Sequence, residues 1–231
     1  MPRNKEDFVR YKYTTREEWL KIRGKGIGGS DAAVILGLSS WKTPRQLWFE
    51  KMDLNPIEED NDDELKAYGR GAESAIRTLF TLKYVNKLKV RHTKEVLISK
   101  KCDYFRASLD GEIEVLEDFV FETYDGQFIH LSKGMRGILE IKTKFMPSKD
   151  EWKDSIPNVY YAQGVHYMNV TKYDFIIYVA ELRYSSGSSS IRNFLFTKEQ
   201  VKEDMSYLEF KEHEFWNKVI EKQEIPLQIK L

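Results

Sequence analysis

The sequence GILEIKTK at residues 137–144 has the alternation of apolar and polar side chains that is typical of a strand. Successive side chains of a strand point to opposite faces. Leu139 and Ile141 are therefore expected to enter an apolar core, whereas Glu140 and Lys142 lie together on the other face. The segment predicts one strand that presents a carboxylate and an ammonium group to the same place.

A second carboxylate is expected beside this strand. Asp110 is followed by Gly111, and an Asp-Gly pair between alternating segments is typical of a hairpin turn. A further hairpin is expected around residues 125–126, before the chain returns to the first strand. Asp110 would then lie next to Glu140, where two hard oxygen ligands would form a Mg²⁺ site with a lysine beside it.

A metal ion with a neighbouring lysine suits phosphodiester hydrolysis. The metal polarises a phosphoryl oxygen and acidifies a water, and the cation stabilises the charge that develops. The same residues also fit an ordinary amphipathic strand, whose Glu140 and Lys142 would form a solvated ion pair of little energetic worth. The short pattern alone leaves both readings open, and the choice between them depends on the rest of the chain.

The composition is typical of an intracellular globular protein. The chain has 231 residues, of which 41% are hydrophobic and 32% charged. Lys plus Arg equals Asp plus Glu at 37 each, so binding to nucleic acid would have to come from local basic patches. A single cysteine, Cys102, excludes an internal disulfide and fits a reducing compartment. Because the chain shows neither a membrane-spanning apolar run nor a signal peptide, we expect a cytoplasmic protein.

The order of the expected elements predicts an α/β or α+β fold with a central sheet. Capping patterns and apolar spacing predict helices that begin near Thr15, at Ser30 or Asp31, and at residues 43, 65, 156 and 197. Strands are expected at residues 96–98, 104–109, 112–115, 119–121, 128–130, 138–144, 173–182 and 191–196.

The glycine-rich turn at residues 26–29 leads into Ser30 and Asp31, either of which would cap a helix of small residues. Backbone amides and a hydroxyl group at a helix start form a place where an anion binds. A plain turn with a helix cap is the simpler alternative for a glycine run of this kind.

Five sequence blocks extend the case beyond any single motif. They are GIGGSDAA (26–33), GRGAESA (69–75), RASLDG (106–111), EIK (140–142) and YAQGVHY (161–167). In this order they resemble the YqaJ family of phage recombinases, which is similar to lambda exonuclease within the PD-(D/E)-x-K nuclease superfamily. The resemblance implies a restriction-endonuclease-like core, a central mixed β-sheet flanked by helices, in a single nuclease domain over residues 1–231.

The resemblance also implies roles for particular residues. Glu73, Asp110 and Glu140 would hold the divalent metal, which would be Mg²⁺ with Mn²⁺ as a substitute. Lys142 would orient the attacking water or stabilise the pentavalent phosphorus, and Gln163 would position water or phosphate beside the site.

A second group of residues matches the place where lambda exonuclease binds the terminal 5′-phosphate. This group consists of Arg23, Ser30 and Ser108. Tyr167, four residues after Gln163, is expected to brace its helix. The chain departs from the family pattern at residue 109, where a leucine replaces proline, and in the longer segment between the two strand carboxylates.

The implied function is a Mg²⁺-dependent 5′-to-3′ exonuclease that acts on double-stranded DNA ends and leaves a 3′ single strand for an annealing protein. The resemblance further implies a ring-shaped trimer, encoded by a phage or prophage and acting in a bacterial host. One alternative is an endonuclease or repair nuclease of the same superfamily, although Cys102 alone cannot ligate the iron–sulfur cluster that many repair nucleases carry. A DNA-end-binding module without turnover is the alternative from another class.

Overall fold

The computed structural model describes residues 6–53, 64–92, 94–146, 152 and 155–227. In that part of the chain the helices are α1 (Arg16–Gly24), α2 (Gly29–Ile35), α3 (Pro44–Lys51), α4 (Glu64–Lys83), α5 (Asn158–Thr171) and α6 (Lys202–Ile220). The strands are β1 (Phe8–Lys12), β2 (Leu88–Arg91), β3 (Glu95–Ser99), β4 (Arg106–Ala107), β5 (Gly111–Val115), β6 (Phe119–Glu122), β7 (Phe128–Leu131), β8 (Arg136–Met146), β9 (Phe175–Tyr184) and β10 (Ser189–Thr197).

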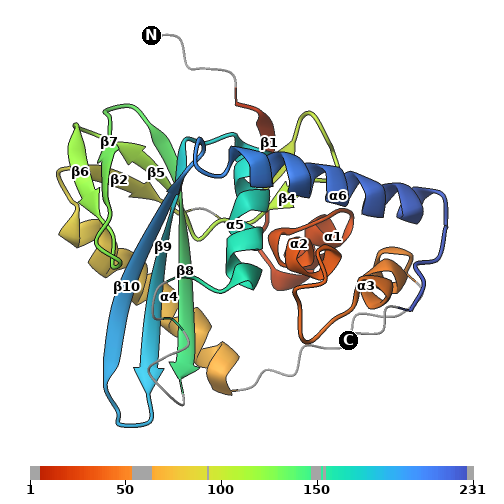
Figure 1. Ribbon diagram of the computed structural model, residues 1–231, viewed down its shortest axis with the longest axis horizontal. Coiled ribbons are helices and arrows are strands. Elements are labelled where there is room, and N and C mark those ends of the chain that lie inside the picture. Colours follow the sequence, from red (N-terminus) through yellow and green to blue (C-terminus); the bar gives the residue numbers. More distant parts are fainter. Residues whose placement is uncertain (1–5, 54–63, 93, 147–151, 153–154, 228–231) are drawn as a thin grey trace.

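A five-stranded mixed sheet forms the centre of the fold, with the order β10-β9-β8-β5-β2 (Figure 1). Strands β8 and β9 are parallel, and the other neighbours are antiparallel. Helix α5 connects the parallel pair, as a parallel connection requires. The central mixed sheet predicted from the sequence is therefore confirmed.

Helices cover both faces of the sheet, and β8 shows why. Leu139 and Ile141 pack into an apolar cluster that includes Ile76 and Phe80 of α4. Ile138, on the opposite face, belongs to the cluster formed with α2, α5 and α6. Figure 1 shows α4 on one side of the sheet and α5 on the other. The alternation predicted for residues 137–144 is confirmed, and Glu140 itself is buried too.

Two glycines allow the helices near β8 to pack closely. A Cβ atom on Gly29 would lie 2.5 Å from Cε1 of Tyr167 and 2.8 Å from Cγ of Gln163. A Cβ atom on Gly164 would lie 1.7 Å from the hydroxyl oxygen of Tyr178 on β9. Gly29 thus lets α2 approach α5, and Gly164 lets α5 approach the sheet.

The prediction of a hairpin at Asp110 and Gly111 is wrong, because the strands on either side of this pair do not pair with each other. Strand β4 pairs with β3 in a separate three-stranded sheet, whereas β5 pairs with β2 and β8. Gly111 serves close packing instead of a turn, since its Cβ would lie 3.2 Å from Cβ of Leu139. The register nevertheless pairs Gly111 with Leu139, so Asp110 lies beside Glu140 as predicted, on a different path of the chain.

Three further expectations are corrected by the described residues. Helix α2 is capped by Gly28, not by Ser30 or Asp31, because the Asp31 carboxylate at the third helical position accepts a hydrogen bond from the Gly28 amide at 2.9 Å. The last helix begins at Lys202, after a turn that follows residue 197. Strands β1 and β2 were not expected.

The hairpin predicted around residues 125–126 is confirmed. Strands β6 and β7 pair as a two-stranded antiparallel sheet, and Gly126 has the positive φ of 80° that such a turn requires. None of the helices within the described ranges is both long enough and apolar enough to cross a membrane.

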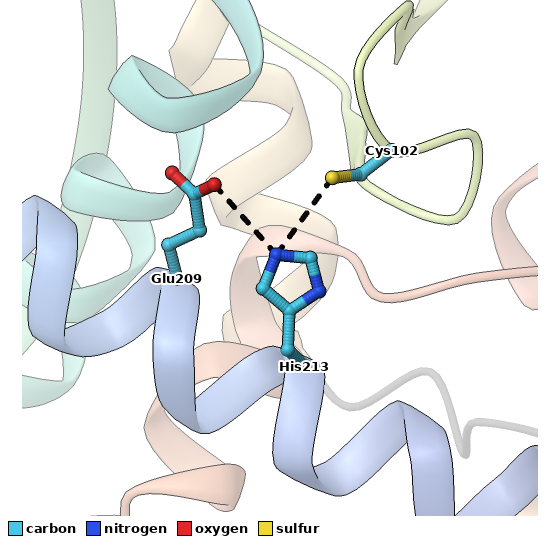
Figure 2. A group of neighbouring side chains, drawn as sticks. All are labelled: Cys102, Glu209 and His213. Carbon is cyan, nitrogen blue, oxygen red and sulfur yellow. Dashed lines mark hydrogen bonds and ion pairs between the residues drawn. The ribbon is translucent and has the colours of Figure 1, made fainter.

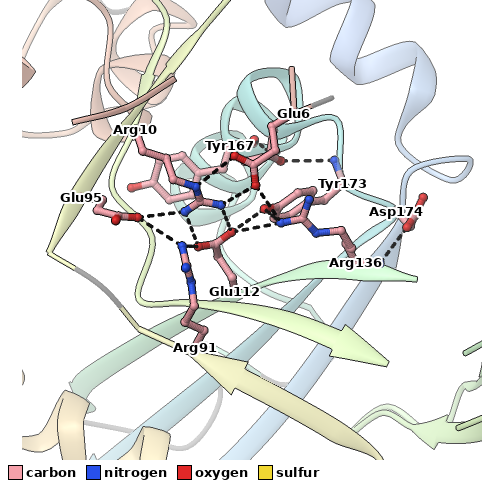
Figure 3. A network of polar contacts seen from close by, with 10 residues as sticks. Glu6, Arg10, Arg91, Glu95, Glu112, Arg136, Tyr167, Tyr173 and Asp174 are labelled. Carbon is pink, nitrogen blue, oxygen red and sulfur yellow. Dashed lines mark hydrogen bonds and ion pairs between the residues drawn. The ribbon is translucent and has the colours of Figure 1, made fainter. Parts of the chain in front are cut away.

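A network of ion pairs fastens the N-terminal strand β1 to the central sheet (Figure 3). Both terminal nitrogens of Arg10 donate to the two oxygens of Glu112 on β5, each at 2.7 Å. Arg10 also pairs with Glu95 at 2.9 Å, and the Tyr173 hydroxyl donates to Glu112. Burial disfavours the charge of Glu112, but these hydrogen bonds lower its pKa to about 2.

Candidate active site

A cleft of about 750 Å³ opens between α1, α2, α4, α5 and β8, the middle strand of the central sheet. Seven of the eight residues predicted to bind metal, phosphate or the reacting groups line it, namely Arg23, Glu73, Ser108, Asp110, Glu140, Lys142 and Gln163. Strand β8 supplies Glu140 and Lys142, and α5 supplies Gln163. Segments that are distant in the sequence therefore meet in one place.

Glu140, Lys142 and Gln163 form a closed group of polar contacts. Oε1 of Glu140 lies 2.7 Å from Nζ of Lys142 and accepts a hydrogen bond from Nε2 of Gln163 at 2.8 Å. Oε1 of Gln163 accepts from Nζ of Lys142 at 3.0 Å. Tyr167 was expected to brace its helix; its hydroxyl oxygen accepts a second bond from the same amide at 2.9 Å and so holds the Gln163 side chain. The side chain of Gln163 fixes the direction of both charged groups.

Asp110 is oriented by the strand that carries Glu140. Its Oδ2 accepts a hydrogen bond from the backbone amide of Ile141 at 2.7 Å. Burial, with the nearby charge of Glu73, raises the pKa of Asp110 to about 6. Burial and the charge of Asp110 raise the pKa of Glu140 to about 8. The carboxylates of Asp110 and Glu140 thus share a space that favours protons or a cation.

Glu73 lies at the margin of this pair. It projects from α4 and forms an ion pair with Arg77 one turn later. Burial raises the pKa of Glu73, although Arg77 opposes the rise. Within the described part of the chain, Glu73, Asp110 and Glu140 do not bring three ligand atoms within 4.8 Å of one another. The structure therefore brings Asp110 and Glu140 together, while Glu73 borders the same cleft.

The residues present fit a divalent cation with oxygen ligands. Oε2 of Glu140 is buried and has no hydrogen-bond partner, which is costly for a carboxylate unless a cation approaches it. Lys142 supplies one positive charge against two carboxylates, the buried Glu140 and the partly buried Asp110. Hard oxygen donors of this type are those that Mg²⁺ prefers.

Lys142 remains a cation in these surroundings. Burial works against its charge, but the carboxylates of Glu140 and Asp110 raise the pKa of its ammonium group above the ordinary value. Its Nζ also lies 5.0 Å from the ring centre of Tyr160. An aromatic face at that distance favours a positive charge. Lys142 can therefore donate a hydrogen bond to an anion that enters the cleft.

Two of the three residues predicted to bind a terminal phosphate, Arg23 and Ser108, line the same cleft. Arg23 donates a hydrogen bond to the hydroxyl oxygen of Ser30. Ser30 itself does not line the cleft, so its contact is with Arg23. Trp19 donates from Nε1 to the hydroxyl oxygen of Ser108 at 3.0 Å. The guanidinium carbon of Arg23 lies 4.8 Å from the ring centre of Trp19, which links the two serines.

Several lining residues were not identified from the sequence as part of the site. These are Trp19, Tyr160 and the basic residues Arg16, Arg70 and Arg106. The signal for Arg106 was present, because it begins the block that contains Ser108 and Asp110. Its Nε atom is buried and has no partner, and it lies in a wall that an anion can reach. Leu109, where the family has proline, also lines the cleft.

A profile of the YqaJ-like viral recombinase domain family matches residues 18–174. The chain belongs to this family. One relative is the uncharacterized protein YqaJ of Bacillus subtilis (strain 168), which is 32% identical over 207 residues. The alignment covers 88% of this chain and 56% of the relative, so the chain spans about half the length of that protein.

The fold of this YqaJ-like chain is that of a solved exonuclease. It matches the alkaline exonuclease LHK-Exo from Laribacter hongkongensis with a TM-score of 0.57 and 14% identity, over 89% of this chain and 93% of that chain. The same exonuclease in complex with dAMP matches with a TM-score of 0.58 and 13% identity. The family and the fold class predicted from the sequence are both confirmed.

Proposed function

We propose that this YqaJ-like protein is a Mg²⁺-dependent deoxyribonuclease that degrades double-stranded DNA from its ends in the 5′-to-3′ direction. The observation that carries the proposal is the group of Asp110, Glu140 and Lys142 that lines the cleft, with Glu140 buried and the other two partly buried. We propose further that residues 1–231 form one nuclease domain. The fold of LHK-Exo and the family match support a nuclease acting on DNA.

In this proposal the metal would be held by Asp110 and Glu140, with Glu73 at its margin. Mg²⁺, or Mn²⁺ in its place, would supply a Lewis acid that polarises the phosphoryl oxygen and acidifies a water. Asp110 would stay in position through the amide of Ile141. Glu140 would stay in position through the Gln163 amide, which leaves Oε2 directed away from that bond.

Lys142 and Gln163 would act on the reacting groups directly. The ammonium group of Lys142 would orient the attacking water or donate to the phosphoryl oxygens as their negative charge increases. Gln163 accepts a hydrogen bond from Lys142, so it would hold the ammonium group in one direction and would position water or phosphate beside it. Fixed donors of this kind lower the barrier because they need no reorientation during the reaction.

Arg23, Ser30 and Ser108 would bind the 5′-phosphate of the strand being degraded. Arg23 would exchange its contact with Ser30 for phosphate oxygens, for which a guanidinium group is well suited. Ser108, held by Trp19, would add a hydroxyl donor. A pocket that binds a terminal 5′-phosphate would favour strand ends over internal positions, and thus an exonuclease over an endonuclease.

The product and partners follow from that reaction. Removal of 5′ nucleotides would leave a 3′ single strand as substrate for an annealing protein. A homotrimeric ring would reconcile the equal numbers of acidic and basic residues with close tracking along DNA, because only the inner wall of the ring need be basic. We propose that the protein acts in the cytoplasm of a bacterial host and is encoded by a phage or prophage.

The test is digestion of a linear duplex that carries different labels at the two ends of one strand. The duplex would be supplied with and without a 5′-phosphate, in Mg²⁺ and in EDTA. Early loss of the 5′ label, dependent on metal and faster with the phosphate, is the expected result. Early loss of the 3′ label would contradict the 5′-to-3′ direction. Cleavage of a covalently closed circle would contradict the requirement for a DNA end. Binding to ends without any cleavage in Mg²⁺ or Mn²⁺ would favour an end-binding module.

A further inference from the structure

A second group of metal-ligand side chains lies outside the cleft. Cys102, in the loop between β3 and β4, faces Glu209 and His213 on α6 (Figure 2). Among the described residues, their Sγ, carboxylate oxygen and ring nitrogen lie within 4.8 Å of one another. Sγ lies 3.8 Å from Nε2 of His213, and Nε2 lies 3.6 Å from Oε1 of Glu209. The last two residues are four apart and share one face of the helix.

These separations are close to those of a tetrahedral zinc site. Zinc binds cysteine sulfur at about 2.3 Å and histidine nitrogen or carboxylate oxygen at about 2.0–2.2 Å. At tetrahedral angles those bond lengths imply about 3.4–3.6 Å between ligand atoms. The separation of 3.8 Å between Sγ and Nε2 exceeds that range by about 0.2 Å, and the separation of 3.6 Å between Nε2 and Oε1 lies at its upper limit. Small side-chain rotations would complete the geometry.

The histidine is oriented as a metal ligand. Its Nδ1 forms a hydrogen bond with the hydroxyl group of Tyr104. When Nδ1 carries the proton and donates it, Nε2 presents its lone pair to the cysteine and the glutamate. Ligand histidines in metalloproteins commonly have their other nitrogen fixed in this way. The ring of Phe105, centred 5.4 Å from the imidazole, limits its rotation further.

The cysteine is also fixed before any metal binds. Its side chain is 8% exposed, its amide donates to Oγ of Ser99 at 3.3 Å, and its carbonyl accepts from the amide of Phe105 at 2.9 Å. The loop therefore presents Sγ toward α6 instead of solvent (Figure 2). A rigid thiol facing an oriented imidazole lowers the conformational cost of binding an ion.

Two lysines contact Glu209 in the absence of a metal ion, and one of them would have to move when an ion binds. Lys101 forms an ion pair with Oε1 of Glu209, and Nζ of Lys172 lies 3.7 Å from Oε2. The side chain of Lys101 is 67% exposed, and ion pairs with exposed partners contribute little stability. A divalent cation bound to three ligands would displace Lys101 into solvent and leave Lys172 beside the free oxygen.

We propose that Cys102, Glu209 and His213 bind a Zn²⁺ ion, with water at the fourth position. A thiolate, an imidazole and a carboxylate favour zinc over the hard cation Mg²⁺. The ion would link two segments that are distant in the sequence. It joins α6 to the loop that leads into β4, and the chain continues from β4 to Ser108 and Asp110 in the cleft. The inference does not depend on the proposed nuclease reaction.

Cobalt, which takes the place of zinc in such sites and absorbs light, provides the direct test. The full chain would be titrated with Co²⁺ in excess Mg²⁺, so that oxygen sites are already filled. A thiolate-to-cobalt charge-transfer band that saturates at one equivalent is expected, and Cys102→Ser should abolish it. Competition with Zn²⁺ should remove the band. Its absence from the folded protein would overturn the proposal.

Variants of the other two ligands separate this site from casual surface binding. Zn²⁺ affinity should fall roughly tenfold or more in His213→Ala and in Glu209→Gln. Glu214→Gln, an exposed carboxylate on the same helix, is the matched control and should keep the affinity of the parent. Circular dichroism would verify that each variant folds. Because Cys102→Ser and Glu209→Gln conserve side-chain shape, unchanged Zn²⁺ affinity in both would refute the site even if His213→Ala failed to fold.

Discussion

Oε1 of Glu140 lies 2.7 Å from the ammonium nitrogen of Lys142, although only 1% of Glu140 is exposed. A buried carboxylate is costly unless positive charge offsets it. Lys142 contacts one of the two oxygens, and Oε2 of Glu140 has no hydrogen-bond partner. The pair therefore leaves room for a second positive charge at the free oxygen, which is the basis of the metal assignment.

Replacement of Lys142 by Met should reduce the rate of cleavage by roughly 10²- to 10⁴-fold, because the variant loses the cation that faces the developing charge. Binding to DNA ends should change little, since most of the basic residues that line the cleft remain. Single-turnover digestion and a binding titration would measure the two quantities separately. Lys144→Met, at an exposed position two residues later in β8, is the matched control and should cleave normally.

Metal binding should become tighter as the pH rises from about 5 to about 9. The pKa values of Asp110 and Glu140 are raised to about 6 and about 8, so protons compete with the metal below those values. The folded protein without metal binds more protons here than the unfolded chain, and its stability therefore falls as the pH rises through this window.

Thermal unfolding with and without Mg²⁺ would measure this linkage. The increase in melting temperature caused by Mg²⁺ should be larger at about pH 9 than at about pH 5. In Glu140→Gln the increase should be small at both pH values, because one of the two strand carboxylates is gone. An equal increase at both pH values in the parent protein would contradict a site built on these two groups.

The preference for a 5′-phosphate should depend on Arg23. In Arg23→Ala the ratio of rates on phosphorylated and unphosphorylated ends should approach one, while cleavage of the unphosphorylated duplex should change by less than about threefold. Initial rates on the two duplexes would give the ratio. Arg45→Ala removes a surface arginine that pairs with Glu224 instead of lining the cleft, and it should keep the preference of the parent. An unchanged ratio in Arg23→Ala would remove this residue from the phosphate pocket.

Glu112→Gln should lower the free energy of unfolding by about 2–3 kcal/mol near neutral pH. The pKa of Glu112 is lowered from 4.5 to about 2 in the folded state, so its contribution is present above the unfolded value and is lost as the pH falls through about 2. The difference between parent and variant should therefore shrink on going from about pH 7 to about pH 3. Urea unfolding at the two pH values would measure it, with Glu114→Gln at an exposed position of β5 as the control. A constant difference would show that the charge of Glu112 is not what stabilises the network.

The sequence was sufficient to predict β8 because the two faces of this strand differ. Leu139 and Ile141 pack into an apolar cluster, whereas Glu140 and Lys142 line the cleft. Asp110 was placed correctly beside Glu140 through a hairpin that does not exist. An Asp-Gly pair indicates a turn, but it carries no information about which strand the following residues join. In the pairing of β5 with β8, the paired residues lie 22 to 28 positions apart in the sequence. Local sequence patterns do not encode such contacts.

The sequence analysis did not predict strand β1 or the group of Cys102, Glu209 and His213, for related reasons. In β1 the apolar residues do not mark a buried face, since Phe8 is buried whereas Val9 and Tyr11 are exposed. The attachment of β1 to the central sheet depends instead on the contact of Arg10 with Glu112 on β5, at a separation of 102 residues. Cys102 and His213 are 111 residues apart. Neither contact leaves a periodic signal in one sequence.

Gly29→Ala should impair both stability and catalysis, because the added methyl group would lie 2.5 Å from the Tyr167 ring and 2.8 Å from the Gln163 side chain. Overpacking of this kind costs roughly 1–3 kcal/mol. The displaced Gln163 would release Glu140 and Lys142, so the cleavage rate should fall further than the loss of folded protein explains. Gly24→Ala at the end of α1 is the control, since its methyl group would meet nothing within 4 Å and should leave both quantities unchanged. Equal stability and equal rates for Gly29→Ala and the parent would show that close packing of α2 against α5 does not position Gln163.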